Sequence, residues 1–383
     1  MNTFNVFFIV LVCYIGLVYI YLKYITNKYL RVIVDRTPEL GDRPSLKTNQ
    51  LIREKYADKE VINILVLTGG GVRGIVPLQV LTKLEELTGK KTGELFEFMA
   101  GTSTGAINCA ILSVPEGDSG YKFSAADVVR DYVRNIRRMF SAPWYHHLLT
   151  LFGILGPLYL PEGKLEILEG YFGDYTLADL HNNLIVPVYD ISENSLRVIR
   201  NWEPTINGNY TNYLLRDLIH GASNPPMLFS PRRFSVGGKT HVFIDPGVIL
   251  NNPAEVALLN AWFMFPNKKI RIVLIGNGGN DSDHYSHTHM AEFGAYGLLQ
   301  YIMNSPIVSA KFSTDLVQEY IHEARDYGLN VDFVYINADG GHELATASTS
   351  SQNMEKINQY ATRLMTENQE KIDYLASVLK NRT

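Results

Sequence analysis

With 383 residues, of which 46% are hydrophobic and 19% charged, the chain has the composition of a folded globular protein and can bury a sizeable core. Its formal net charge of -4 provides no broad cationic surface, which argues against nucleic acid as a partner. Of its two cysteines, Cys13 lies in an apolar run and Cys109 stands alone, so a disulfide framework is excluded and a reducing compartment is favoured.

The first predicted element is a membrane anchor. Residues 4–22 carry no charge and are long enough to cross a hydrocarbon core as a helix. No positive charge precedes this run and no small-residue cleavage site follows it, so we predict an uncleaved single-pass anchor over residues 1–26; a signal peptide and a buried core helix are the alternatives. Because Lys23, Lys28 and Arg31 follow the run, the positive-inside rule predicts a cytoplasmic catalytic domain.

A linker or loosely packed lead-in is predicted for residues 27–60, which mix charges with Pro38 and Pro44 and show no sustained apolar period. The remaining residues, 61–383, contain no internal repeat, low-complexity tract or long charge block. We therefore predict one folded domain after the anchor and the lead-in.

Within this domain, short β-rich apolar runs alternate with helical stretches, which is typical of an α/β sandwich. Strands are predicted at residues 61–67, 96–100, 184–189, 196–199, 241–244, 271–275 and 332–336, and helices at residues 76–87 and 106–112. Apolar residues recur at helical spacing between Met354 and Leu379, which predicts an amphipathic C-terminal helix packed on the domain.

A candidate nucleophile lies between the second predicted strand and the helix that follows it. Residues 101–105 read Gly-Thr-Ser-Thr-Gly, the pattern G-x-S-x-G, in which a sharp turn exposes a serine hydroxyl at the sheet edge. The glycines at both ends allow close approach of backbone and helix. Small residues also build ordinary turns, so the assignment of Ser103 as nucleophile depends on its surroundings.

A glycine-rich turn follows the first predicted strand. Residues 69–74 read Gly-Gly-Gly-Val-Arg-Gly, and successive backbone N–H groups in such a turn can hold a developing oxyanion. The candidate oxyanion hole comprises Gly69, Gly70, Gly71, Arg73 and Gly74. Arg73 either adds positive charge near the oxyanion or forms a structural ion pair.

The same turn also fits the dinucleotide fingerprint G-x-G-x-x-G, which holds a pyrophosphate at a helix N-terminus. That interpretation requires an acidic residue at the end of the next strand, about 20 residues on. The acidic residues in that region, Glu94 and Glu97, are poorly placed for it. A nucleotide-dependent enzyme is therefore the weaker interpretation.

The candidate base is Asp245, which directly follows a predicted strand, and strand ends are where the sites of α/β proteins assemble. A three-member triad would need a histidine, and His220 and His241 are the nearest in sequence. Single histidines are more often ordinary polar residues, so a catalytic histidine is the lesser alternative.

Taken in order, these motifs resemble the patatin-like phospholipase family. The resemblance rests on the glycine turn at residues 69–74, the Gly-Thr-Ser-Thr-Gly elbow at residues 101–105, and Asp-x-Gly at residues 245–247 followed by Asn-Asn-Pro at residues 251–253. It covers roughly residues 62–380.

The resemblance implies a three-layer α/β/α fold with a mostly parallel central sheet. It also implies a dyad of Ser103 and Asp245 without histidine, and hydrolysis of carboxylic esters of phospholipids or related lipids without a metal or another cofactor. Two residues depart from the family's usual wording: Thr68 stands where an aspartate commonly precedes the glycines, and Pro246 stands where the motif commonly has glycine. Neither departure removes a reacting atom, and we expect a change in local loop geometry.

The sequence thus predicts a lipid acyl hydrolase of the phospholipase A or lysophospholipase type, whose anchor keeps it beside a membrane. The predicted partners are the acyl-ester lipid and the membrane, and protein partners are left open. A catalytically silent lipid-binding or scaffold protein, suggested by Thr68 and Pro246, is one alternative. A transacylase that uses the same serine is another.

Two further segments have weaker signals. An apolar stretch over residues 144–155 suits a lid or a membrane contact, but we expect ordinary core packing for it. A cluster of acidic and histidine side chains within residues 280–289 suits zinc, but we expect a solvated loop. The cluster comprises Asp281, Asp283, His284, His287 and His289.

Overall fold

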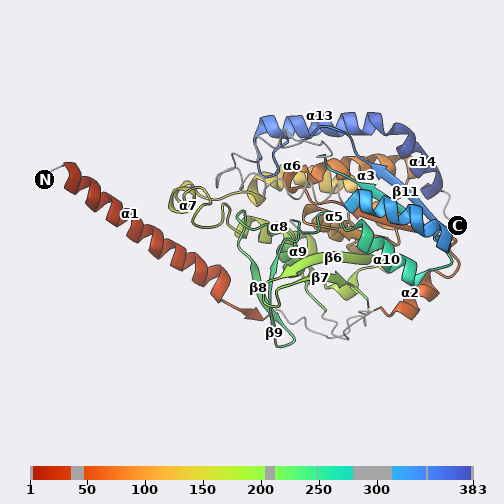
Figure 1. Ribbon diagram of the computed structural model, residues 1–383, viewed down its shortest axis with the longest axis horizontal. Coiled ribbons are helices and arrows are strands. Elements are labelled where there is room, and N and C mark those ends of the chain that lie inside the picture. Colours follow the sequence, from red (N-terminus) through yellow and green to blue (C-terminus); the bar gives the residue numbers. More distant parts are fainter. Residues whose placement is uncertain are drawn as a thin grey trace.

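The computed structural model describes residues 3–35, 47–202, 212–247, 249–278, 313–341 and 344–380. Figure 1 shows an α/β body from which one long helix, α1 (Thr3–Ile25), projects, with the N-terminus at its far end and the C-terminus on the opposite side of the body.

A nine-stranded sheet forms the centre of the body, in the order β1-β8-β9-β6-β3-β2-β10-β11, with β7 paired to β6. Strands β6, β3, β2, β10 and β11 pair in parallel, whereas β7 and β9 run antiparallel to β6. The sheet comprises β1 (Val34–Asp35), β2 (Val61–Leu67), β3 (Phe98–Gly101), β6 (Asn183–Asp190), β7 (Ser195–Arg200), β8 (Arg232–Val236), β9 (Lys239–Ile244), β10 (Lys269–Ile275) and β11 (Val331–Ile336). Every strand predicted from the sequence is present, within two residues at either end.

Helices cover both faces of the sheet, so the predicted three-layer α/β/α fold is confirmed (Figure 1). Side chains of β2 alternate between the two cores: Leu65 and Leu67 pack into one, and Ile64 and Val66 into the other. The first face holds α3 (Ile75–Thr88), α5 (Thr104–Leu112), α6 (Ala125–Met139), α8 (Glu162–Phe172), α9 (Leu215–Ala222), α13 (Ser351–Glu367) and α14 (Gln369–Lys380); the second holds α2 (Asn49–Lys55), α10 (Ala254–Met264) and the helix of residues 313–324.

Shorter elements connect these layers. They are the π-helix η1 (Thr26–Arg31), the 3-10 helices η2 (Gly71–Gly74), η3 (Leu177–Asp179) and η4 (Arg325–Tyr327), the helices α4 (Thr92–Leu95) and α7 (Trp144–Leu149), and a hairpin of β4 (Pro115–Glu116) and β5 (Gly120–Tyr121).

Strand β6 brings two strand ends together. It pairs with β3 at Ile185, opposite Ala100, and with β9 at Tyr189, opposite Ile244. Because β7 occupies the other edge of β6 along residues 185–190, β3 and β9 share one edge. β3 runs parallel and β9 antiparallel to β6, so their C-terminal ends point toward each other. The turns that follow β3 and β9 therefore meet.

The C-terminal segment forms two helices instead of the predicted single one. The break falls at Asn368, whose side-chain Nδ2 donates to the carbonyls of Leu364, at 2.9 Å, and Asn337, at 2.8 Å. The apolar residues of both helices, such as Ile357 and Ile372, are buried in the first core.

Helix α1 together with η1 is long and apolar enough to cross a membrane. Within the segment predicted as a lead-in, Ile52 of α2 and Tyr56, which directly follows α2, pack into the second core. The expectation of core packing for residues 144–155 is wrong for most of this segment, since Trp144, Phe152 and Ile154 are 76%, 72% and 78% exposed. Residues 280–289, the possible metal cluster, lie outside the described residues.

Candidate active site

Ser103 lies in the sharp turn between β3 and α5. Its backbone has φ 56° and ψ -124°, a conformation that residues with a side chain seldom adopt and that is typical of a strained nucleophile turn. The flanking glycines make the turn possible: a Cβ at Gly101 would lie 2.3 Å from the carbonyl carbon of Gly105, and one at Gly105 would lie 2.2 Å from the oxygen of Leu67. The sequence therefore requires glycine at both positions for steric reasons.

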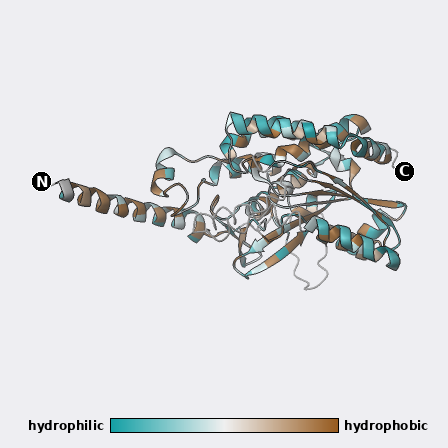
Figure 2. Cartoon of the chain, turned by 45° about the horizontal axis from the view of Figure 1, so that its top comes forward, coloured by the Kyte–Doolittle hydropathy of each residue, from teal (hydrophilic) through white to brown (hydrophobic). Residues whose placement is uncertain are grey.

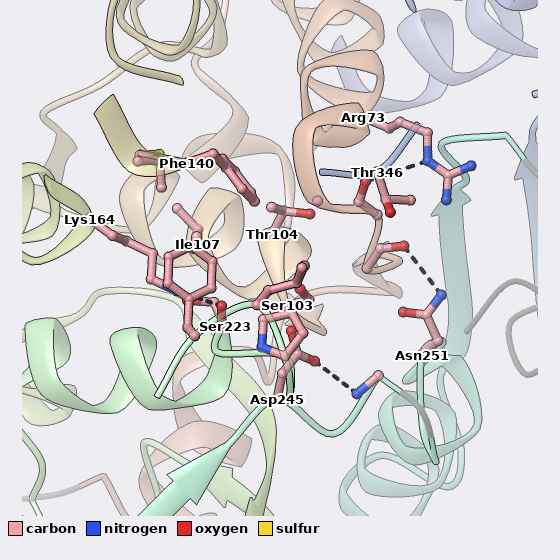
Figure 3. Close-up of a pocket in the computed structure, with 18 of the residues that line it drawn as sticks. Arg73, Ser103, Thr104, Ile107, Phe140, Lys164, Ser223, Asp245, Asn251 and Thr346 are labelled. Carbon is pink, nitrogen blue, oxygen red and sulfur yellow. Dashed lines mark hydrogen bonds between the residues drawn. The ribbon is translucent and has the colours of Figure 1, made fainter. Parts of the chain in front are cut away.

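Asp245 follows β9 and reaches the same point. Figure 3 shows its carboxylate beside Ser103. Oδ1 accepts a hydrogen bond from the Gly247 N–H at 2.8 Å, whereas the buried Oδ2 accepts none from the described residues. Burial raises the pKa of Asp245 to about 6, although the nearby Ser103 hydroxyl, the Gly247 N–H and the charge of Lys164 each lower it. A carboxylate with this pKa is suited to accept a proton near neutral pH.

Lys164, on α8, is a second ionisable group in the pocket, and no pattern in the sequence indicated it. Its side chain is 2% exposed, and Nζ donates to the carbonyl of Ser223 at 2.6 Å and to Oδ1 of Asn224, and lies 3.8 Å from the ring centre of Phe229. Burial lowers the pKa of Lys164 to about 7, an effect that the charge of Asp245 opposes. The carbonyl of Asn224 also accepts from the Asp245 N–H at 3.1 Å, so one residue orients both charged groups.

The glycine turn is held by two asparagines. Gly69 donates its N–H to the carbonyl of Asn251 at 3.2 Å, and the Gly69 carbonyl accepts from the side chains of Asn251, at 3.2 Å, and Asn277, at 3.0 Å. The N–H groups of Gly70 and Gly71 donate to no other described residue, and both glycines line the pocket. Of the predicted oxyanion donors, these two are available and Gly69 is not.

Arg73 and Gly74 contribute to the turn in another way. The guanidinium of Arg73 is buried, donates to the carbonyls of Gly70, at 3.4 Å, and Gly341, at 3.5 Å, and extends away from Ser103 (Figure 3). It forms no ion pair with the acidic side chains that the structure describes, and burial lowers its pKa to about 10. Gly74 lies outside the pocket lining, and its carbonyl accepts from the Asn108 side chain at 2.8 Å. Both residues therefore hold the turn in shape.

Thr104, immediately after Ser103, lines the pocket and was missed by sequence reasoning. It begins α5, so its N–H has no partner within the helix, and it donates to no other described residue. In α/β hydrolases the residue after the nucleophile commonly supplies an oxyanion donor, which was the signal in the sequence. The positive end of the α5 dipole points to the same place.

The pocket that joins these groups is mostly apolar. It has an empty volume of about 1030 Å³, open solvent at its mouth included. Apart from the polar groups above, its walls consist largely of Ile107, Met139, Phe140, Met227, Leu228 and Phe229. Among the described residues no histidine lines it. His220 is bonded instead to the Asn224 side chain at 3.1 Å, and His241 to Asp190 at 3.2 Å. The pocket therefore suits an acyl chain whose ester group reaches Ser103.

Comparison with known proteins is consistent with this geometry. The sequence profile described as Patatin-like phospholipase matches residues 65–258, just over half of the chain. Patatin-like protein 3 of Arabidopsis thaliana is 25% identical, with 80% of this chain and 77% of that protein covered. Patatin-like protein 1 of the same plant is 26% identical over 78% of this chain and 81% of that protein. The human Calcium-independent phospholipase A2-gamma is 30% identical over 58% of this chain and 29% of its own length. The chain belongs to the patatin-like phospholipase family.

Proposed function

We propose that the protein hydrolyses carboxylic esters of phospholipids or related lipids, with Ser103 as nucleophile and Asp245 as general base. Family membership supports lipid acyl hydrolase activity. The observation that carries the assignment of residues is the pairing of a buried aspartate, whose pKa is raised to about 6, with a strained serine at the base of an apolar pocket.

In the proposed reaction, Oδ2 of Asp245 accepts the hydroxyl proton as Oγ of Ser103 attacks the ester carbonyl carbon. The tetrahedral intermediate then expels the alcohol, which takes the proton from Asp245, and an acyl-enzyme remains. Water activated by the same carboxylate attacks the acyl-enzyme, releases the fatty acid and returns the proton to Ser103. One carboxylate can thus serve as base and acid in turn.

The developing oxyanion would be stabilised by the backbone N–H groups of Gly70, Gly71 and Thr104. All three residues line the pocket, and none of these N–H groups donates to another described residue. Removal of one such donor from a serine protease costs about 3 kcal/mol of transition-state stabilisation. We assign Gly69, Arg73 and Gly74 to holding the turn rather than to contact with the oxyanion.

A phospholipid is the first substrate to test, since the human relative is named a phospholipase A2 and the pocket walls are apolar. The residues at the two departures are held by hydrogen bonds: the Pro246 carbonyl accepts from the N–H groups of Ile249 and Leu250, both at 2.8 Å, and the Thr68 carbonyl accepts from the Asn277 side chain at 3.2 Å. This supports an active enzyme over a silent scaffold. A transacylase would use the same residues and differ only in the acceptor.

We further propose that α1 anchors the protein in a membrane as a single span, with the domain of residues 61–383 on the cytoplasmic side. The length and apolar character of the helix support the span. The basic residues at its C-terminal end, such as Lys23 and Lys28, support the orientation.

Labelling of the full chain with a fluorophosphonate, together with fatty-acid release from phosphatidylcholine vesicles, tests the proposed dyad. We expect Ser103→Ala to abolish labelling and hydrolysis, and Asp245→Asn to abolish hydrolysis. Ser223→Ala is the matched control, because Ser223 lines the same pocket and should leave labelling intact. A folded wild-type protein that neither labels nor releases fatty acid would establish the silent scaffold, and acyl transfer to an added alcohol in preference to water would establish the transacylase.

A further inference from the structure

The segment of residues 142–161 leaves the rim of the pocket, turns at residues 151–153 and returns to it. Its bend uses positive φ angles at Leu151, Phe152 and Gly153, and hydrogen bonds from the N–H of Phe152 to the His147 carbonyl, at 2.7 Å, and from that of Leu155 to the Thr150 carbonyl, at 2.9 Å, close it. We refer to residues 144–155 as the apolar hairpin. Figure 2 shows it beside α1 and apart from the packed body.

The apolar hairpin has the chemistry of a membrane-inserted segment. Residues 142–161 contain no Asp, Glu, Lys or Arg, although Arg138 and Glu162 lie just outside. Its buried polar side chains are hydrogen-bonded: His146 bonds to the Tyr21 hydroxyl through Nδ1 and to the Pro157 carbonyl through Nε2, both at 2.7 Å, and Thr150 Oγ1 donates to the His146 carbonyl at 2.8 Å. Internal satisfaction of polar groups is what a hydrocarbon environment demands.

Contacts with α1 fix the depth that the apolar hairpin would reach. The Tyr14 hydroxyl donates to the Leu148 carbonyl at 2.7 Å. Tyr14 precedes Lys23, the first charged residue of α1, by nine positions, which corresponds to about 13 Å along a helix. Half of a hydrocarbon core is about 15 Å thick. If α1 spans the bilayer, Leu148 therefore lies deep within the leaflet that α1 crosses last.

Aromatic residues lie at the level expected for the membrane interface. The ring of Tyr145 is 6.4 Å from that of Tyr21, which precedes Lys23 by only two positions. Trp144, next to it, is 76% exposed. Trp and Tyr are the residues enriched at the boundary between headgroups and acyl chains.

The two ends of the segment adjoin residues that line the pocket. The N–H groups of Leu158 and Tyr159 donate to the carbonyls of Met227, at 2.8 Å, and Leu228, at 2.9 Å, and both of these residues line the pocket. At the other end, Phe140 lines the pocket and its ring contacts that of Tyr159, with ring centres 5.5 Å apart. The segment that carries the apolar hairpin is therefore in direct contact with the apolar wall of the pocket.

We propose that the apolar hairpin inserts into the membrane leaflet adjoining the catalytic domain and sets the mouth of the pocket against the lipid surface, so that a phospholipid reaches Ser103 without passing through water. The inference rests on the proposed membrane span of α1 and, for its substrate, on the proposed ester hydrolysis. Continuity with α1 and the absence of charge favour lipid over the apolar face of another protein as the occupant.

Depth measurement with nitroxide labels on the full chain in phosphatidylcholine vesicles tests the insertion. Labels at Ile154→Cys on the hairpin, Ile20→Cys on α1 and Tyr327→Cys on the far side of the body are compared in a Cys13→Ala background; Tyr327 is 85% exposed. We expect the first two labels to collide with oxygen and be shielded from a water-soluble nickel complex, and the third to behave oppositely. An Ile154 label that behaves like the Tyr327 label, while Ile20 remains shielded, would overturn the insertion and leave the anchor intact.

An activity measurement gives an independent test. Phe152→Ser combined with Ile154→Ser should lower hydrolysis of phosphatidylcholine in vesicles about tenfold, which corresponds to roughly 1.4 kcal/mol, and leave hydrolysis of soluble p-nitrophenyl butyrate unchanged. Phe263→Ser on α10, where the side chain is 69% exposed, is the matched control and should alter neither. Equal vesicle hydrolysis by the hairpin variant and the wild type would contradict the proposal. A wild-type protein that hydrolyses neither ester would refute the proposed function, and the label depths would still decide the insertion.

Discussion

Two buried aspartates lie at the ends of neighbouring strands, Asp190 as the last residue of β6 and Asp245 directly after β9, and their pKa values shift in opposite directions. Asp190 is held by hydrogen bonds from His241, Ser192, Arg197 and the Val242 N–H, which outweigh burial and lower its pKa. Asp245 has the Gly247 N–H and the nearby Ser103 hydroxyl, and burial raises its pKa. Burial alone therefore does not raise the pKa of a carboxylate, because the hydrogen-bond donors around it also decide the direction of the shift.

The largest expected effect is the loss of catalysis on substitution of Asp245, the aspartate with fewer hydrogen-bond donors. Asp245→Asn should lower kcat for ester hydrolysis by about a thousandfold, because the amide cannot accept the Ser103 proton. Asp190→Asn should leave kcat per folded molecule close to that of the wild type. Steady-state kinetics with active-site titration measures both, and equal losses in the two variants would remove the distinction.

For the free energy of unfolding we expect the reverse: Asp190→Asn should be the more damaging of the two substitutions. Asp190→Asn should lower the free energy of unfolding by about 3 kcal/mol, because the substitution leaves Arg197 without its buried partner. Asp245→Asn should raise it by up to about 3 kcal/mol at pH 7, since it removes a carboxylate whose pKa of about 6 reflects costly burial. Urea unfolding at pH 7 measures both, and a destabilised Asp245→Asn protein would contradict this account of the site.

The two substitutions should also change the free energy of unfolding over different ranges of pH. The folded-state pKa of Asp245 lies above the unfolded value of 3.8, so its ionisation penalty is full above about pH 6 and disappears as the pH falls toward 3.8. The difference in the free energy of unfolding between the wild type and Asp245→Asn should therefore disappear between pH 6 and pH 4. The pKa of Asp190 is lowered, so its contribution persists at pH 5 and is lost only below pH 3.8. Urea titrations at pH 7, 5 and 4 compare the two windows.

The smallest expected effect concerns Lys164, whose charge lowers the pKa of Asp245. In Lys164→Met the acidic limb of kcat/KM should move from near pH 6 to a higher pH, because the neighbouring cation is lost. Lys164→Arg should restore much of the wild-type profile if it folds, since charge rather than proton transfer is invoked. A pH profile unchanged in Lys164→Met would exclude an electrostatic role for this lysine.

Sequence reasoning predicted the strands and the sharp turn at Ser103 because both are local patterns. The run from Val61 to Leu67 and the pentapeptide around Ser103 each carry their own signal of period and turn chemistry. No local sequence pattern marks Lys164 or Asn277, since their roles depend on contacts across the fold. Asn277, for example, bonds to Gly69, 208 positions away.

Other errors had physical causes of their own. The C-terminal helix divides at Asn368, because the Asn368 side chain bonds to the body as well as to its own helix. Core packing was the wrong expectation for residues 144–155, because an apolar run shows only that water is disfavoured and does not distinguish a protein interior from a lipid one. The sequence also could not show which N–H groups of the glycine turn are free to bind an oxyanion. The Gly69 N–H donates to the carbonyl of Asn251, which is distant in sequence, whereas the N–H groups of Gly70 and Gly71 donate to no described residue.

The meeting of β3 and β9 on one edge of β6 has a consequence for how the site tolerates changes in chain length. The gap between the serine turn and the aspartate turn is spanned by residues 186–188 of β6, a strand that carries neither group. Each residue inserted there would move the two turns apart by about 3.3 Å and reverse the faces of the side chains beyond it. Insertions in the surface connections of the sheet leave that gap unchanged. The most length-sensitive part of the proposed catalytic site is therefore a stretch of the core with no reactive side chain.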